Sequence, residues 1–225
     1  MQPLKIIKQK ITAAAKRAGR DPQSVALVAV SKGQPVDKIR AACAGGLRAF
    51  GENYAQELLK KQAALNTLDI EWHFLGHLQK NKVNKILPVI SWLHSLDSLE
   101  LAQAIHKSAE HPLQCLLEIN LAGEKTKTGL APEAALEMIP KLKEFANVDL
   151  RGLMTIPPQD PNPEKSRPYF RKLFSLLKTI NDRYLYSKPL TELSIGMSYD
   201  FEIAVEEGAT MVRVGTAIFG PRTKK

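Results

Sequence analysis

Val25-Ala-Leu-Val-Ala-Val-Ser-Lys32 is the stretch of sequence that decides the fold of this chain. Six of its eight residues are apolar, and an apolar run without alternation predicts a β-strand that is buried on both faces. Such strands belong to parallel sheets whose two faces are covered by helices. The run ends in Lys32, and an ammonium group at the tip of a buried strand loses hydration. The residue therefore needs a structural or a chemical reason to be there.

Lys32 has two interpretations. Its side chain can extend along apolar surface and place the charge in water, as long cationic side chains commonly do. Alternatively, a lysine amine among apolar side chains is held more readily in its neutral form, which is the form that condenses with an aldehyde to give a Schiff base. The eight residues alone favour the first interpretation, and the rest of the chain favours the second.

Strand-like runs recur along the chain and alternate with helical patterns. One helical pattern follows the first strand, where residues from Val36 to Leu47 recur at intervals of three and four. The predicted strands are Val25–Ser31, Ala49–Asn53, Glu71–Leu75, Trp92–Leu96, Gln114–Leu121, Asp149–Ile156, Leu193–Gly196 and Met211–Gly215. Strands and helices in this order predict an α/β fold, a single (β/α)8 TIM-type barrel over residues 1–225. The main alternative, an open doubly wound sheet, lacks the GxGxxG turn that would follow its first strand.

Three helix ends give further expectations. An extra N-terminal helix over roughly Pro3–Ala18 ends at Gly19, and we expect it to cover the part of the barrel wall that a long eighth helix would cover. Asp97-Ser-Leu-Glu100 resembles a capping box at a helix start. Pro140 lies inside another helical pattern, where it predicts a bend or an early end.

The loops after the last two strands predict a phosphate site. In barrels of this type the chemistry gathers at the carboxyl ends of the strands. The loops Leu193–Ser198 and Val212–Gly220 each contain glycine, which permits close approach of an anion. Ser198 can act as an N-cap while it offers its hydroxyl, and Gly215 with Thr216 repeats the pattern. Either loop alone could be a plain turn and cap, but two in tandem favour phosphate binding.

Arg213 and Asn53 are further candidates at the same rim. Arg213 lies between two valines in the last strand, so its side chain faces either the barrel interior or an ion pair on the outside. Next to a lysine and a phosphate site, contact with a ligand becomes the better interpretation. Asn53 ends the second strand in Phe50-Gly-Glu-Asn-Tyr54 and adds a polar group to the rim.

The sequence gives little support for a metal site or for disulfides. His73 and His77 are four residues apart, but Gly76 and the strand-like setting break the helical geometry of a HExxH zinc site. Cys43 and Cys115 show no CxxC spacing, so we interpret both as small buried hydrophobic residues. We therefore expect no metal.

The formal net charge of +9 could attract an acidic partner. The basic residues are spread along the chain, however, and the cluster Lys80, Lys82 and Lys85 has no interleaved aromatic residues, so a nucleic-acid partner is not expected. No apolar stretch approaches the roughly 20 residues of a membrane span. The start of the sequence lacks the apolar region of a secretory signal. We expect a cytoplasmic protein that does not contact membranes.

A lysine, a phosphate site and a barrel together suggest pyridoxal 5′-phosphate (PLP), an aldehyde that carries a phosphate. The chain also resembles the pyridoxal phosphate homeostasis proteins (the YggS/PROSC family) from its first strand to Gly220. The motifs that carry the resemblance are Leu27-Val-Ala-Val-Ser-Lys32, Phe50-Gly-Glu-Asn-Tyr54, Trp72-His-Phe-Leu-Gly-His-Leu-Gln79, Gly152-Leu-Met154, Leu193-Ser-Ile-Gly-Met-Ser198 and Val212-Arg-Val-Gly-Thr-Ala-Ile-Phe-Gly220. Ile195 and Val214 are conservative differences from the residues that the family usually has at these positions, Met and Ile respectively.

The resemblance implies a barrel like the N-terminal domain of alanine racemase, of fold-type III. It implies that Lys32 forms a Schiff base with PLP and that Arg213 faces the pyridine nitrogen. The other residues that it assigns to the cofactor are Ser198, Gly215 and Thr216 for the phosphate, the Met197 backbone beside them, and Asn53 and Met154 along the ring. Family members are monomeric, cytoplasmic PLP carriers or regulators rather than enzymes, with PLP-dependent apo-enzymes or a regulatory protein as possible partners.

Two alternatives stay open. The chain could be a small fold-type III enzyme, an amino-acid racemase or lyase, although no second proton-transfer residue is evident after the last strand. A cation opposite the pyridine nitrogen would also weaken the ring as an electron sink. The chain could instead be a basic interaction protein whose barrel is only a scaffold.

Overall fold

The computed structural model describes residues 2–124 and 126–221 of the chain. Eight parallel strands close into a barrel: β1 (Ala26–Val30), β2 (Ala49–Glu52), β3 (Glu71–Phe74), β4 (Trp92–Leu96), β5 (Leu113–Glu118), β6 (Val148–Met154), β7 (Glu192–Ser194) and β8 (Met211–Val214). Each strand pairs with its neighbours in sequence, and β1 pairs with β8 to close the ring. The predicted (β/α)8 barrel is confirmed, with its strands in the predicted places.

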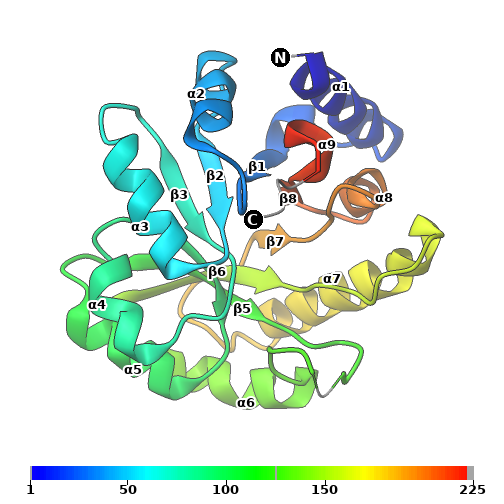
Figure 1. Ribbon diagram of the computed structural model, residues 1–225. Coiled ribbons are helices and arrows are strands. Elements are labelled where there is room, and N and C mark those ends of the chain that lie inside the picture. The colour runs from blue at the N-terminus through cyan, green and yellow to red at the C-terminus, as the bar shows by residue number, and fades with distance from the viewer. Residues whose placement is uncertain (1, 125, 222–225) are drawn as a thin grey trace.

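Helices surround this barrel (Figure 1). They are α1 (Gln2–Arg17), α2 (Val36–Ala44), α3 (Ala55–Ala64), α4 (Val83–Ile86), α5 (Leu99–Ser108), α6 (Pro132–Leu142), α7 (Arg167–Asp182), α8 (Phe201–Glu206) and α9 (Thr216–Phe219). Short 3-10 turns occur at Pro22–Ser24, Lys80–Lys82 and Pro163–Ser166. No helix in the described ranges is both long enough and apolar enough to span a membrane.

All strands except β4 are shorter than predicted at their carboxyl ends. β5 was expected to reach Leu121 but ends at Glu118, because the chain beyond it pairs with its own loop. The Asn120 N–H donates to the Leu130 carbonyl at 2.8 Å, and the Leu130 N–H donates to the Glu118 carbonyl at 2.8 Å. A local apolar pattern cannot distinguish such a loop from a longer strand. The shortening leaves loops, rather than strands, around the mouth of the barrel.

The N-terminal helix α1 completes the barrel wall. One stripe of α1 is buried, because apolar residues recur along it at intervals of three and four: Leu4, Ile7, Ile11, Ala14 and Ala15. This stripe packs against α8 and α9, so the first helix and the last helix of the described residues lie side by side (Figure 1). The final helix α9 has only four residues, too few to cover the wall beside β8 and β1. The expectation that α1 takes this place is confirmed.

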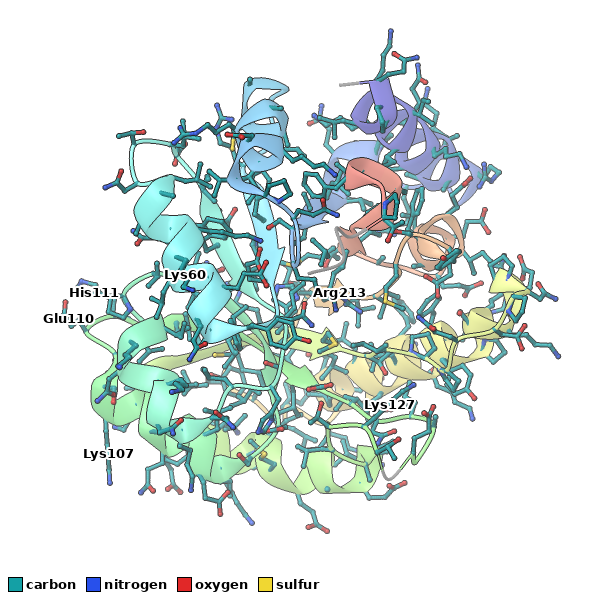
Figure 2. All side chains as sticks on the ribbon, viewed as in Figure 1. Lys60, Lys107, Glu110, His111, Lys127 and Arg213 are labelled. Carbon is teal, nitrogen blue, oxygen red and sulfur yellow. The ribbon has the colours of Figure 1, made fainter. Side chains whose placement is uncertain are left out.

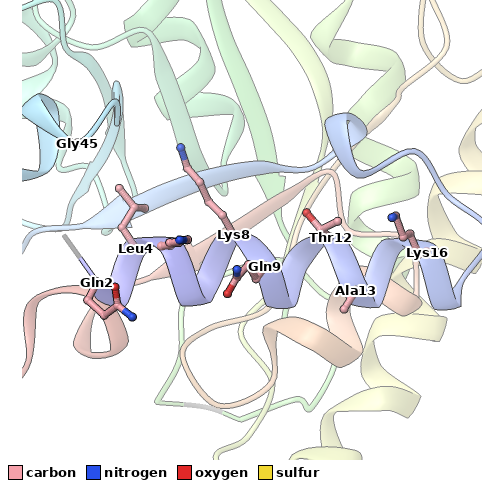
Figure 3. Close-up of a pocket in the computed structure, with 9 residues that line it drawn as sticks. Gln2, Leu4, Lys8, Gln9, Thr12, Ala13, Lys16 and Gly45 are labelled. Carbon is pink, nitrogen blue, oxygen red and sulfur yellow. The ribbon is translucent and has the colours of Figure 1, made fainter.

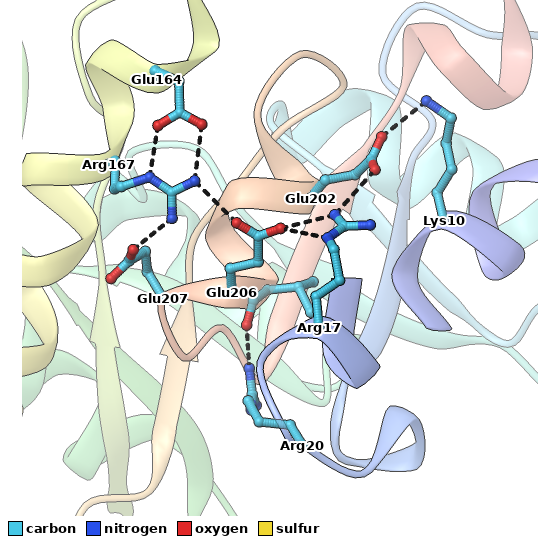
Figure 4. Close-up of polar contacts among 9 residues, drawn as sticks. Lys10, Arg17, Arg20, Glu164, Arg167, Glu202, Glu206 and Glu207 are labelled. Atoms are coloured by element: carbon cyan, nitrogen blue, oxygen red, sulfur yellow. Dashed lines mark hydrogen bonds and ion pairs between the residues drawn. The ribbon is translucent and has the colours of Figure 1, made fainter. Parts of the chain in front are cut away.

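Arginines from α1 and α7 hold α8 from two sides (Figure 4). Arg17 Nε donates to Glu206 Oε1 at 2.8 Å, and Arg167 Nη2 donates to the other oxygen of the same carboxylate at 2.9 Å. Arg167 also donates to Glu207 at 2.6 Å, and Arg17 lies 3.5 Å from Glu202. A six-residue helix has little stability of its own, so these contacts help to fix it on the barrel.

The barrel interior mixes apolar and polar side chains. Residues two apart on a strand face the same side, so Met211 and Arg213 of β8 point inward together, and Val28 of β1 pairs with Arg213. A small apolar cluster fills part of the interior: Val28, Trp92, Leu116, Met154 and Met211. Buried polar residues His73, His94, Ser194 and Arg213 share this space. Filling by side chains makes the interior a packed core rather than a pore.

Helix α5 begins differently from the prediction. Its N-cap is Ser98, whose hydroxyl accepts from the Leu101 N–H at 3.3 Å. Asp97 is not the cap, because its carboxylate turns to His77, with 3.0 Å between Asp97 Oδ2 and His77 Nδ1. Pro140 lies two residues before the end of α6, which agrees with the predicted early end of that helix.

Candidate functional site

A cavity of about 190 Å³ opens at the mouth of the barrel. It lies beyond the carboxyl ends of β1, β2, β7 and β8, where barrels of this type place their sites. Most of the residues predicted for the site line it: Lys32, Asn53, Met197, Ser198, Arg213, Gly215 and Thr216. Gln159 and Tyr199 line it as well and were not predicted.

Met154 is the predicted site residue that the structure does not bring to the cavity wall. It is the last residue of β6, only 1% exposed, and it packs inward with Val28 and Trp92. Ile156, two residues further along, lines the cavity instead. The assignment of Met154 came from the family resemblance, and the strand that ends at Met154 turns this side chain into the barrel core.

Lys32 lies in a turn directly after β1 and is half-buried. The residues on either side of it are fixed by acidic side chains. The Ser31 hydroxyl donates to Glu52 Oε1 at 2.6 Å, and the Gly33 N–H donates to Glu57 Oε1 at 2.6 Å. Gly33 has φ +69°, which glycine adopts without strain. The backbone around Lys32 is therefore held on both sides.

A buried lysine joins these contacts into one cluster. Lys61 Nζ donates to the Ser31 carbonyl at 2.6 Å and to the carboxylates of Glu52 and Glu57, each at 2.7 Å. Glu52 is completely buried, and Lys61 is 5% exposed. Burial raises the pKa of Glu52, and the hydrogen bond from Lys61 opposes that rise. The sequence did not reveal this cluster, since only the four-residue spacing of Glu57 and Lys61 pointed to a contact.

Arg213 lies at the floor of the cavity and is 4% exposed. Its Nη1 donates to the Ser194 carbonyl at 2.5 Å and to the Ser194 hydroxyl at 2.7 Å, and its Nη2 donates to the Thr155 carbonyl at 3.0 Å. Burial lowers the pKa of Arg213 to about 10, which leaves the guanidinium charged at neutral pH. Among the described residues, these bonds use three of the five N–H groups of the side chain. The other two make no hydrogen bond to the described residues.

The two C-terminal loops meet at Ser198. Its hydroxyl accepts from the Ala217 N–H at 3.4 Å, which ties the loop after β7 to the start of α9. The prediction that Ser198 acts as an N-cap is wrong. Helix α8 begins later in the chain, and Asp200 occupies the N-cap position of that helix. Asp200 Oδ1 accepts from the Met197 N–H at 2.7 Å. That N–H is therefore already bonded, which is at odds with the predicted help of the Met197 backbone at the phosphate.

Asn53 supplies a polar atom that lacks a partner. Its Oδ1 is buried and has no hydrogen bond within the described part of the chain, although such atoms are normally bonded. The strand ends are close here, because a Cβ added to Gly76 would lie 2.2 Å from the Asn53 carbonyl oxygen. An acceptor of this kind at a cavity wall suits a ligand that donates a hydrogen bond.

The two histidines considered for a metal site, His73 and His77, lie in different surroundings. His73 Nδ1 is 2.9 Å from His94 Nε2 inside the barrel, whereas His77 turns outward to Asp97. Within residues 2–124 and 126–221 no three His, Cys, Asp or Glu side chains are grouped to hold a metal ion.

A larger hollow, of about 700 Å³, lies elsewhere, along α1 (Figure 3). Its charged residues are Lys5, Lys8 and Lys16, and it contains no acid, histidine or cysteine among the described residues that line it. It is an open depression beside an exposed helix face. It offers cations but no group for acid–base or nucleophilic chemistry, so the mouth of the barrel is the better candidate site.

Comparisons with known proteins match nearly the whole chain. Residues 4–223 match the family model "Alanine racemase, N-terminal domain". A protein of Aquifex aeolicus named pyridoxal phosphate homeostasis protein is 46% identical over 217 residues, which cover 95% of this chain and 94% of that protein. A protein of the same name from Pseudomonas aeruginosa is 44% identical over 218 residues, with 95% and 91% covered.

Among solved structures, the chain is similar to PipY of Synechococcus elongatus with PLP bound. The two share 38% sequence identity and a TM-score of 0.83, and the match covers 93% of this chain and 100% of PipY. The resemblance that the motifs indicated is thus found along nearly the whole chain.

Proposed function

We propose that this protein binds PLP at the mouth of the barrel and takes part in PLP homeostasis. The chain belongs to the pyridoxal phosphate homeostasis proteins, within the alanine racemase N-terminal domain family. The observation that carries the proposal is that Lys32 and Arg213 line one cavity, together with the two C-terminal loops. PLP supplies an aldehyde that condenses with primary amines, and a phosphate.

The residues present fit that group. Lys32 offers the amine, on a turn held by Ser31 and Gly33. Ser198 and Thr216 place two hydroxyls at the same wall, with Gly215 between β8 and α9. We assign the phosphate to these hydroxyls and the neighbouring backbone, and we assign the pyridine ring to the space between Asn53 and Arg213.

Arg213 supports a role in holding the cofactor rather than in using it. A guanidinium beside the pyridine nitrogen disfavours protonation of that nitrogen, and an unprotonated ring withdraws electrons less well. We propose that the protein retains and releases PLP without a reaction of its own. The expected monomeric state, cytoplasmic location and protein partners stay predictions.

The experiment that tests binding uses the absorbance of the purified protein after addition of PLP. We expect a visible band that borohydride removes, and mass mapping should then find the added pyridoxyl group on Lys32. The variant Lys32→Ala should show no covalent attachment, whereas Lys60→Ala should behave like the wild type because Lys60 is exposed on α3 (Figure 2). Attachment to another lysine, or no band at all, would refute the assignment.

The experiment that tests catalysis measures exchange of the Cα hydrogen of amino acids in deuterated water. A panel of common amino acids is incubated with the PLP-loaded protein, with Lys32→Ala as the control. We expect no exchange above that of free PLP. Exchange that depends on Lys32 would instead favour the alternative of a small fold-type III enzyme.

A further inference from the structure

A line of buried polar side chains runs from Arg213 into the barrel interior. The Ser194 hydroxyl is 2.8 Å from His94 Nδ1, and His94 Nε2 is 2.9 Å from His73 Nδ1. Ser194 and His94 are completely buried, and His73 is 2% exposed. His73 Nε2 then faces Glu71 Oε1 at 3.8 Å. Glu71 begins β3, at the end of the barrel opposite the cavity, so the line crosses the interior.

Arg213 fixes the direction of every hydrogen bond in this line. A guanidinium can only donate, so the Ser194 oxygen accepts from it. The described residues bond to that oxygen only through Arg213 and His94. The Ser194 hydrogen therefore goes to His94 Nδ1, which makes Nδ1 an acceptor and places the hydrogen of a neutral His94 on Nε2.

The same reasoning carries through to His73. His94 Nε2–H donates to His73 Nδ1, so a neutral His73 also carries its hydrogen on Nε2. His73 Nε2 is buried without a hydrogen-bond partner among the described residues, and it faces the carboxylate of Glu71. An N–H toward a carboxylate is favourable, whereas a lone pair there would be repelled. The cation at one end and the anion at the other end thus require the same tautomers.

We propose that His94 and His73, as neutral Nε2–H tautomers, are positioning residues for Arg213. Through Ser194 they fix the rotation of the guanidinium at the cavity floor, and they do so only while both are neutral. If His94 took up a proton, both of its nitrogens would donate, and the Ser194 oxygen would have to accept from two cationic groups. The inference rests on the proposed function, in which Arg213 contacts bound PLP.

The charges around His94 agree with its neutral form. His94 faces His73 and Arg213, and burial together with these two groups lowers the pKa of His94. Arg213 also faces Asp200 and Glu118, which favour its charge. The remaining charged neighbour is Glu71, which accepts from Trp92 Nε1 at 2.9 Å.

The first test needs no PLP. Long-range ¹H–¹⁵N spectra of the ¹⁵N-labelled protein at neutral pH report which ring nitrogen of each histidine carries the hydrogen, and single His→Leu variants assign the signals. We expect Nε2–H for both His94 and His73. An Nδ1–H tautomer or a doubly protonated ring at either residue would overturn the proposal.

The second test is a double-mutant cycle on PLP affinity. His94→Leu should raise the dissociation constant about tenfold in the wild-type background and by less than twofold in Arg213→Gln, because contacts that act through one residue are not additive. His94→Gln, which keeps one acceptor and one donor, should restore much of the affinity. His111→Leu is the matched control, since His111 is exposed at the edge of the molecule (Figure 2).

The outcomes separate the two proposals. If His94→Leu folds poorly, Ser194→Ala repeats the cycle with a smaller change. We again expect a larger loss of PLP affinity in the wild-type background than in Arg213→Gln. Equal losses in both backgrounds would mean that the histidines act by packing alone, and the inference would fail. A wild-type protein that does not bind PLP would refute the proposed function, while the tautomers would still be decided by the spectra.

Discussion

The side chains at the cavity differ in how they are attached to the protein. Arg213 is buried and bonded to two carbonyls and a hydroxyl. Lys32 is half-buried on a turn, and the residues on either side of it contact the cluster of Glu52, Glu57 and Lys61. One cation is thus built into the barrel floor, and the other is carried at its rim.

Arg213→Gln should weaken PLP retention more than Lys32→Ala does. Loss of the lysine removes a covalent link but leaves the anion and ring contacts, whereas loss of the guanidinium removes a buried charge and leaves carbonyls unpaired. We expect at least about a tenfold difference in dissociation constant between the variants, or about 1.4 kcal/mol. Equilibrium dialysis measures both constants, and equal retention would contradict this ranking.

Lys61→Met should destabilise the fold strongly. Removal of Lys61 leaves the carboxylate of Glu52 buried without its cation, and breaking a buried pair in this way costs about 3–5 kcal/mol. Urea unfolding measures the loss. Lys60→Met is the matched control, because its side chain is exposed one position away and should change stability by less than about 0.5 kcal/mol. The double variant Glu52→Gln/Lys61→Met should recover part of the loss, and a loss as small as that of the control would show that the pair is not needed.

Among single residues, the sequence predicted the polar residues at the ends of strands that line the cavity, but not the buried residues that hold those cavity residues in place. Lys32, Asn53 and Arg213 could be found because each is a polar residue at the end of, or inside, an apolar run. Lys61 and His94 could not, because a lysine on a helix and a histidine in a strand look the same whether they are buried or exposed. Their burial depends on which elements the closed barrel brings together.

Among the elements, α8 depends most on its neighbours. It carries the loop with Met197 and Ser198 into the cavity wall, yet it has only six residues. Burial raises the pKa of Glu206 and of Glu207, but hydrogen bonds from arginines outweigh burial, and both pKa values end below the usual one. The hydrogen bond to Glu164 is the main reason that the pKa of Arg167 is raised.

Arg167→Met should loosen α8 in a pH-dependent way. A carboxylate with a lowered pKa stabilises the folded state above its unfolded pKa, about 4.5, and this contribution is lost as pH falls through the lower folded value. We expect a cost of about 1 kcal/mol at pH 7, since the pairs are partly exposed, and a smaller cost near pH 3. Thermal unfolding at both pH values measures the difference. A cost that is unchanged by pH would mean that Arg167 acts through packing.

The ends of elements were harder to predict than their existence. The apolar periodicities gave each strand and the N-terminal helix correctly. Ser98 rather than Asp97 caps α5, because the Asp97 carboxylate contacts His77 from another loop. That contact could not be predicted from the local sequence. Strand β6 likewise ends two residues before the predicted Ile156.

For the molecule as a whole, the polar interior ties stability to pH. A histidine whose folded pKa lies below its unfolded value of about 6.5 stays neutral in the barrel but takes up a proton when the chain unfolds. Burial lowers the pKa of His94 in this way. Stability is then fully present above about pH 6.5 and falls as the solution becomes more acidic.

His94→Leu should flatten this dependence. Between pH 6.5 and 5 the free energy of unfolding of the wild type should fall by up to about 1.4 kcal/mol per pH unit more steeply than that of the variant, the slope for one proton. Urea unfolding across this range compares the two, and His111→Leu should keep the wild-type slope. If the free energy of unfolding of His94→Leu and of the wild type changed with pH in parallel, His94 would have the same pKa in the folded and the unfolded state.

The contact of α1 with α8 and α9 has a consequence for synthesis on the ribosome. Helix α1 has as its partners segments that are translated much later, and β1 likewise waits for β8. Domains generally begin to fold from the N-terminus as they are made, but here α1 stays undocked until α8 and α9 have been synthesised. The nascent chain must therefore keep an apolar stripe exposed while the intervening strands and helices are made, and the ring can close only after β8 has left the ribosome.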